Sequence, residues 1–82
     1  MLHIILNGAK LHTKEAMHDY LAQMLHLPAC YGRNLDALYD CLTDICEETE
    51  LVLLHWDAFD HTKRARRVME DSAEENDNLH IK

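Results

Sequence analysis

The hydrophobic and polar positions of the chain fall into blocks whose repeat changes between that of a strand and that of a helix. An apolar run at 2–6 is followed by Asn7–Gly8, a dipeptide typical of a turn after a strand. Thr13 is of a residue type that often caps a helix, and apolar residues then recur at helical spacing at 16, 17, 20, 21, 24 and 25. The pattern therefore predicts a strand and then a helix, which ends at Leu27–Pro28.

The middle of the chain repeats this order of a polar start and an apolar periodic segment. Asn34 is expected to cap a second helix that runs to about Ile45. The predicted buried face of this helix consists of Leu35, Leu38, Cys41, Leu42 and Ile45. The continuous apolar run Leu51–Trp56 is typical of a strand that is buried on both faces.

The end of the chain is predicted to hold a turn or short helix at 57–62, a helix over about Lys63–Glu75 and a strand at 79–81. The residues of this helix expected to face inward are Ala65, Val68, Met69 and Ser72. Because strands alternate with helices, they are expected to pair in parallel through right-handed crossovers. The predicted fold class is α/β: a small three-stranded parallel sheet with helices packed against it, in a single domain over 1–82.

Length and composition limit the functions that the chain can have. A chain of 82 residues buries about 60–65% of its unfolded surface, which allows a modest core but no deep catalytic cleft. A hydrophobic fraction of 48% with one Pro and two Gly excludes disordered and low-complexity classes. The first residues read as a strand rather than a signal peptide, and no apolar run approaches a membrane span. The three cysteines have no CxxC spacing, so a reduced, cytoplasmic protein without a membrane partner is expected.

The negative charge is concentrated in the middle of the chain. The formal net charge is −7 at pH 7, and the segment 34–62 contains eight carboxylates and no Lys or Arg. Such a charge repels the backbone of nucleic acids and anionic membranes. A charged partner is therefore expected to be a basic protein, and nucleic acid is not expected to bind.

Carboxylates form a line along the predicted second helix. Asp36 and Asp40 are one turn apart, Asp44 extends the line, and Tyr39 flanks it. Like charges at this spacing destabilise a helix by about 0.2–0.5 kcal/mol, and an anion near the C-terminal end also opposes the helix dipole. An ordinary solvated acidic face is the simpler interpretation, but the absence of any Lys among these positions favours a cationic partner.

The charges of the predicted last helix are arranged against its dipole. Basic residues occupy the first half and acidic residues the second half, where Asp71 and Glu75 are one turn apart. A helix selected for stability alone would have the opposite order. The carboxylates at this end therefore also indicate a cationic partner.

Neither catalysis nor metal binding is indicated by the other side chains. Paired carboxylates on an exposed helix turn lack the different environments that split the pKa values of an acid and a base. The seven histidines show no HExxH spacing, and His18 and His26 are expected on helix surfaces. Cys41 is expected to be a small core residue. No metal, no cofactor and no enzymatic activity are therefore predicted.

The segment 27–43 reads LPACYGRNLDALYDCLT and resembles the signature of the barstar family, which consists of small intracellular inhibitors of secreted bacterial ribonucleases. The resemblance covers almost the whole chain, including the opening strand before Asn7–Gly8 and the run LVLLHW, and weakens after Phe59. It implies that the second helix and the loop before it block the active site of a ribonuclease.

The resemblance also implies roles for individual residues. Asp40 would replace a substrate phosphate among the basic catalytic groups of the enzyme. Asp36 would pair with a basic residue at the rim, and Tyr39 would pack beside them. Glu75 matches an additional acidic contact of the family, and Asp71 a weaker one a turn earlier. The other residues expected to bind the partner lie in the loop and on the second helix: Cys30, Tyr31, Asn34 and Thr43.

The chain departs from the family pattern mainly at the surface expected to face the partner. Cys30 stands where the type member has a tyrosine, Tyr39 where an indole is usual, and Ile45 replaces another contact aromatic. The stretch between LVLLHW and the last helix is also shorter by roughly a helix and its loop. These differences imply a different cognate nuclease.

The sequence thus predicts an inhibitor or immunity protein that forms a 1:1 complex with a basic ribonuclease or ribonuclease toxin domain. The enzyme would be either the cell's own secreted ribonuclease or a competitor's toxin. Two alternatives stay open. One is a barstar-like regulatory or ligand-binding module without a nuclease target. The other is a small metal-dependent enzyme or metal sensor that uses the histidines and Cys30.

Overall fold

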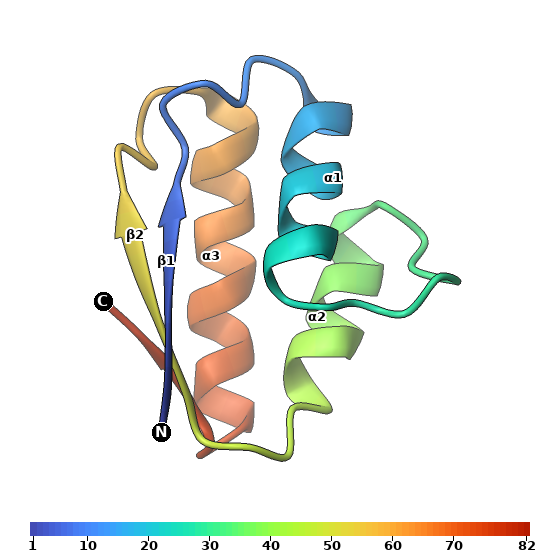
Figure 1. Ribbon diagram of the computed structural model, residues 1–82, viewed down its shortest axis with the longest axis vertical. Coiled ribbons are helices and arrows are strands. Elements are labelled where there is room, and N and C mark those ends of the chain that lie inside the picture. The colour runs from blue at the N-terminus through green and yellow to red at the C-terminus, as the bar shows by residue number, and fades with distance from the viewer.

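A computed structural model describes residues 1–82 and shows strands and helices in the predicted order (Figure 1). The elements are β1 (Leu2–Asn7), α1 (Lys14–Met24), α2 (Leu35–Thr43), β2 (Thr49–Leu54), α3 (Asp60–Glu75) and β3 (Leu79–Ile81). The three strands are parallel and lie in the order β1-β2-β3. The predicted α/β fold class is therefore confirmed. None of the helices has the length and hydrophobicity that crossing a bilayer requires.

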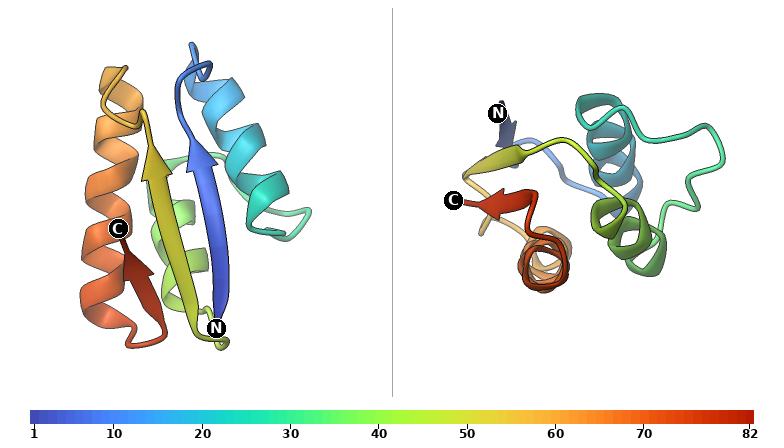
Figure 2. Two further views of the ribbon diagram at one scale, coloured as in Figure 1. Left: turned by 60° about the vertical axis from the view of Figure 1, so that its left-hand side comes forward. Right: turned by 90° about the horizontal axis from the view of Figure 1, so that it is seen from below.

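All three helices lie on the same face of the sheet (Figure 2). Right-handed crossovers between strands that follow one another in chain order place every connecting helix on one side. The prediction that the second strand is buried on both faces is therefore wrong. On the open face of the sheet Ile5 is 56% exposed and Leu54 is 43% exposed. The polar end of this face pairs the imidazole Nδ1 of His3 with Oε1 of Glu50 at 3.1 Å.

The core lies between the sheet and the helices and contains 12 buried hydrophobic residues. Leu6 and Leu51 enter it from the sheet, and Leu21 and Leu38 enter it from α1 and α2, all without exposed surface. Gly8, directly after β1, allows a close approach of Trp56. A Cβ atom at Gly8 would lie 2.9 Å from Cε3 of that indole and 3.0 Å from the carbonyl oxygen of His55, which explains the glycine.

Several boundaries differ from the prediction. The second helix ends at Thr43 rather than near Ile45. The second strand covers Thr49–Leu54 rather than 51–56, because His55 has a φ of 53° and turns the chain out of the sheet.

The last helix begins at Asp60, where Oγ1 of Thr62 accepts a hydrogen bond from the backbone N–H of Phe59 at 3.3 Å. A short connection, 55–59, joins β2 directly to α3, and this connection contains no helix. Inside α3, Ala65, Met69 and Ser72 are buried as predicted, and Val68 is partly buried.

Candidate functional site

The rotation of α2 about its axis is fixed by its cap and by its buried residues. Oδ1 of Asn34 accepts a hydrogen bond from the backbone N–H of Ala37 at 2.7 Å, which confirms the predicted N-cap. Leu38 and Leu42 have no exposed surface. Because these two leucines must face the core, the opposite side of the helix faces solvent.

The solvent side of α2 presents the predicted line of carboxylates. Asp36 and Asp40 are exposed within the helix, and Asp44 is the exposed C-cap residue. Tyr39 beside them is partly buried. The hydroxyl of Thr43 donates to the backbone carbonyl of Asp40 at 3.0 Å, so this side chain is held within the last turn.

None of these three aspartates forms an ion pair within the chain. The charges of these aspartates are screened only by water and mobile ions. A cationic surface that docks on α2 would therefore meet carboxylates that have no competing internal partner.

The acidic end of α3 lies alongside the second half of α2. The two helices pack against each other and run in the same direction (Figures 1 and 2). Helical spacing places Asp71 and Glu75 on the same flank as Arg64, which lines a cavity together with residues of α1 and α2. Both carboxylates are exposed and have no ion-pair partner within the chain. The structure thus places the predicted acidic residues on two helices, α2 and α3, that pack against each other.

Asn76, which the sequence pattern did not single out, joins the C-terminal ends of these two helices. Its Nδ2 lies 3.0 Å from the carbonyl oxygen of Leu42, 3.2 Å from that of Thr43 and 2.9 Å from that of Ile45. The last carbonyl groups of a helix have no N–H donor inside the helix, and a side-chain donor can satisfy them. Asn76 therefore fixes the end of α2 against the end of α3. An Asn directly after the predicted end of the last helix was the only signal available in the sequence, and it reveals neither the burial of this side chain nor its partners.

The loop between α1 and α2 is attached to α1 by a buried hydrogen bond. The hydroxyl of Tyr31 lies 2.7 Å from Nδ1 of His18. His18 is 5% exposed and Tyr31 is 8% exposed, so the prediction that His18 lies on the helix surface is wrong. The pattern of apolar residues assigned His18 to the polar side because it could not show that the loop folds back over α1. His26, in contrast, is exposed as predicted, but it lies in the turn after the end of α1 and not on the helix.

Burial governs the titration of this pair. Burial, and next the charge of Arg33, lowers the pKa of His18. Burial also raises the pKa of the Tyr31 hydroxyl to about 12. The hydroxyl therefore keeps its proton at neutral pH, and Tyr31 supports the loop from the inside instead of facing outward.

The three cysteines are free thiols with different surroundings. Cys30 is exposed in the loop before α2, at a position that was predicted to contact the partner. Cys41 on α2 is partly buried and packs against the core, and burial raises the pKa of its thiol. Cys30 is thus the only predicted contact residue with an accessible thiol. No three His, Cys, Asp or Glu side chains lie together in a way that suits a metal ion.

The sequence matches a family model over nearly its whole length. That family is described as Barstar (barnase inhibitor), and the match covers residues 1–79. A protein of Bacillus subtilis (strain 168) named "Putative ribonuclease inhibitor YrdF" is 51% identical over 43 residues, which make up 52% of this chain and 47% of that protein. The match thus spans about half of the length of this relative.

Proposed function

The chain belongs to the barstar family, and we propose that it inhibits a basic ribonuclease by covering the enzyme's active site with α2 and the loop before it. The observation that supports this function best is the unpaired state of Asp36 and Asp40 on a rigid helix. A ribonuclease binds the phosphates of RNA in a cationic cleft. A fixed row of carboxylates is complementary to such a cleft in charge and, when held on a helix, in spacing.

In this proposal each acidic residue makes its own contact with the ribonuclease. Asp40 takes the place of a substrate phosphate, and Asp36 pairs with a basic residue at the rim. Glu75 adds a contact from α3, and Asp71 adds a weaker one a turn earlier. Tyr39 packs beside Asp40 through its exposed part.

The loop before α2 completes the proposed interface. Cys30 is exposed and would contact the enzyme directly. The side chains of Asn34 and Thr43 already form hydrogen bonds within the chain. Asn34 caps the start of α2, and Thr43 bonds to the backbone in the last turn of α2. Tyr31, held by His18, would keep the loop in its bound shape, which reduces the entropy lost on binding.

The proposed partner is a ribonuclease or a ribonuclease toxin domain, bound in a 1:1 complex. The chain itself would act without a cofactor and without catalysis, in the cytoplasm of a bacterial cell, as an immunity protein.

The proposal is tested with a basic ribonuclease, chosen from the gene neighbourhood of this chain if one is encoded there. The inhibition constant is measured for the wild type and for Asp40→Ala. Removing one partner of a buried, hydrogen-bonded charge pair costs about 3 kcal/mol or more, so inhibition should weaken by roughly a hundredfold or more.

Glu47→Ala serves as the matched control, because it also removes one exposed carboxylate but lies between α2 and β2. It should change the inhibition constant by less than about threefold. Unfolding in urea checks that both variants keep the wild-type stability. If Asp40→Ala inhibits as well as the wild type, Asp40 is not the anchor of the complex.

A further inference from the structure

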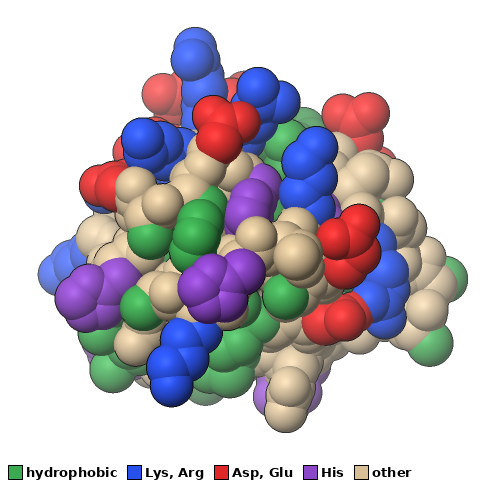
Figure 3. Space-filling model, turned by 90° about the horizontal axis from the view of Figure 1, so that it is seen from above, with side chains coloured by type: hydrophobic (Ala, Val, Ile, Leu, Met, Phe, Trp, Pro, Cys, Tyr) green, Lys and Arg blue, Asp and Glu red, His purple; other side chains and the backbone are tan.

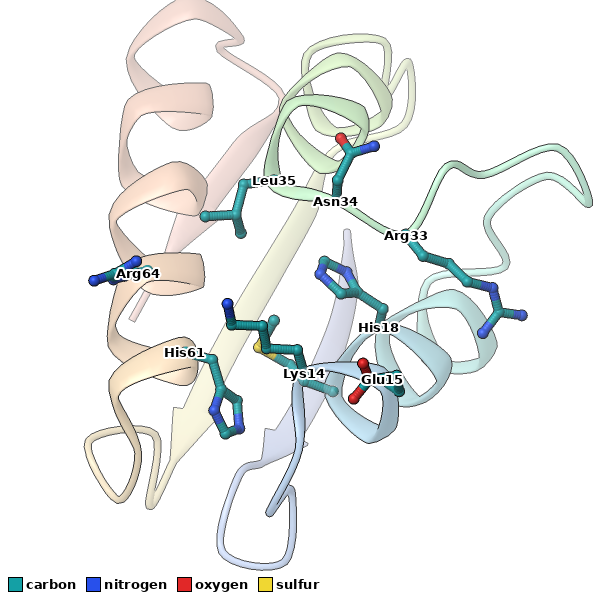
Figure 4. Close-up of a pocket in the computed structure, with 9 residues that line it drawn as sticks. Lys14, Glu15, His18, Arg33, Asn34, Leu35, His61 and Arg64 are labelled. Carbon is teal, nitrogen blue, oxygen red and sulfur yellow. The ribbon is translucent and has the colours of Figure 1, made fainter.

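A cavity of about 300 Å³ opens between the first turns of α1 and α3 and the start of α2 (Figure 4). This volume is at the lower end of the range of small-ligand pockets, about 300–1,000 Å³. The cavity is lined from α1, α3 and the segment that enters α2. Its charged and imidazole side chains are Lys14, Glu15, His18, Arg33, His61 and Arg64, and the polar Asn34 also lines it. In a chain with a net charge of −7, this lining contains three permanent cations and one carboxylate.

The cations differ in their availability. Arg33 pairs with Asp19, and Nε of Arg64 lies 3.0 Å from Oδ2 of Asp60. Both pairs are more than half exposed, and pairs of this kind are weak. Lys14 has no ion-pair partner in the chain, and in Figure 4 its ammonium group extends from α1 toward α3, below Leu35.

His18 supplies a directed hydrogen-bond donor to the same space. Nδ1 is the only hydrogen-bond partner of the buried Tyr31 hydroxyl, which keeps its proton at neutral pH. If this hydroxyl donates to Nδ1, the imidazole proton is on Nε2. Nε2 has no hydrogen-bond partner in the chain, and His18 lines the cavity although it is 5% exposed. In that tautomer the Nε2–H group has no acceptor within the chain and is available to a group bound in the cavity.

The helix ends add to the positive potential of the cavity. α1 and α3 begin at this end of the molecule, and α2 begins farther down, beside α1 (Figure 1). The first N–H groups of a helix have no acceptor inside it. Leu35, the first residue of α2, is part of the lining. Figure 3 shows this end from above, with Lys, Arg and His side chains across it and carboxylates next to several of them.

We propose that this cavity binds a phosphate group, either free phosphate or the phosphate of a small ester such as a nucleotide. The phosphate oxygens would accept hydrogen bonds from Nζ of Lys14, from Nε2 of His18 and from the backbone N–H of Leu35. Glu15 opposes the anion and limits its affinity. The cavity adjoins the proposed ribonuclease interface, because Arg33 and Asn34 belong to the loop before α2. Its cationic side chains are different residues from the carboxylates of α2 and α3, so phosphate binding does not rest on the proposed inhibition of a ribonuclease.

The experiment follows the backbone amide signals of the whole chain by NMR during titration with inorganic phosphate and, separately, with adenosine monophosphate. Sodium chloride at equal ionic strength is the reference. Saturable shifts of residues that line the cavity are expected with both phosphates but not with chloride. Tighter binding of adenosine monophosphate would identify a nucleotide as the better ligand, and equal binding would identify the phosphate group alone. Shifts that chloride reproduces, or that do not involve the lining, would overturn the proposal.

Neighbouring substitutions with opposite effects make the test specific. Lys14→Met should weaken phosphate binding about tenfold, because it removes one charge-assisted hydrogen bond. Glu15→Gln should strengthen it about threefold, because it removes the only carboxylate of the lining. Lys63→Met is the matched control, since Lys63 is exposed and outside the lining, and it should change the affinity by less than twofold. Equal effects of Lys14→Met and Lys63→Met would show that only net charge matters and would exclude the site.

Discussion

The hydrogen bond between His18 and Tyr31 shows how one pair of side chains can hold a binding loop. Their ring centroids are 5.8 Å apart, and both rings are almost completely buried. The backbone N–H of Tyr31 also donates to the carbonyl of Pro28 at 2.9 Å, which closes the loop from inside. The loop that enters the proposed interface is therefore shaped before any partner binds, and its shape depends on a titratable residue.

A neutral His18 is a condition for full stability. Burial and Arg33 lower the pKa of His18 below its ordinary value of 6.5, Glu15 raises it, and His61 lowers it. Between the folded and the unfolded pKa the unfolded chain binds more protons, so the free energy of unfolding falls as the pH falls through this window. Above about pH 6.5 this contribution is constant.

The expected outcome is a loss of wild-type stability as the pH falls below about 6.5 that His18→Gln largely lacks. Urea unfolding at several pH values measures it. His26→Gln, which replaces an exposed histidine after α1, should retain the wild-type pH profile. A profile for His18→Gln that is parallel to that of the wild type would show that other groups cause the acid sensitivity.

At the level of elements, the position of α2 depends on contacts at both of its ends. Asn34 caps the start of the helix from within its own sequence. The end is held by Asn76, which is far away in the chain, and by Nδ2 of Asn78, which lies 3.4 Å from the carbonyl oxygen of Ile45. The proposed binding helix is thus short but fixed, and its C-terminal half is aligned with the acidic end of α3.

Asn76→Ala should lower the free energy of unfolding by about 1–3 kcal/mol, because it removes the donor for buried carbonyls at the end of α2. Asp77→Ala, at the exposed neighbouring position, should change it by less than about 0.5 kcal/mol. Both free energies of unfolding are measured by urea unfolding, monitored by the fluorescence of the buried Trp56. Similar values for the two variants would contradict a specific role of the Asn76 amide.

At the scale of the whole molecule, α1 and α3 begin at one end, and α2 and α3 end at the opposite one (Figure 1). Since all strands are parallel and all helices lie on one face, every helix dipole points in nearly the same direction. Lys14 and Arg64 lie near the helix starts, whereas Asp44 and Glu75 lie near the helix ends. The charges therefore reinforce the helix dipoles as a long-range field, although the same arrangement costs local helix stability. A contribution to this long-range field accounts for the basic start and acidic end of α3, which selection for helix stability alone would reverse.

The field leads to a prediction for the kinetics of binding. The association rate constant with the proposed ribonuclease should fall by about tenfold or more as the salt concentration rises from about 50 mM to about 500 mM, because the Debye length shortens. The dissociation rate constant should change much less. Stopped-flow fluorescence measures both. An association rate that is independent of salt would exclude electrostatic steering.

The sequence predicted the local features of the candidate site correctly. Thr13 and Asn34 cap α1 and α2, as expected, through hydrogen bonds to residues a few positions later. The exposure of Asp36 and Asp40 followed from the spacing of Leu38 and Leu42 within a single helix. These features depend on neighbours within about one helical turn, which a one-dimensional pattern contains. The assignment of binding roles to these residues remains a prediction.

The sequence by itself thus determined the order and type of the elements, the caps of α1 and α2 and the line of carboxylates along α2. Only the tertiary structure decided that these carboxylates have no ion-pair partner, that one face of the sheet stays open, that His18 is buried and that a cationic cavity forms between the first turns of α1 and α3 and the start of α2. Asn76 and Leu42, for example, are 34 positions apart. The physical reason is that these features depend on side chains distant in the sequence, whose contacts exist only after the helices pack on the sheet.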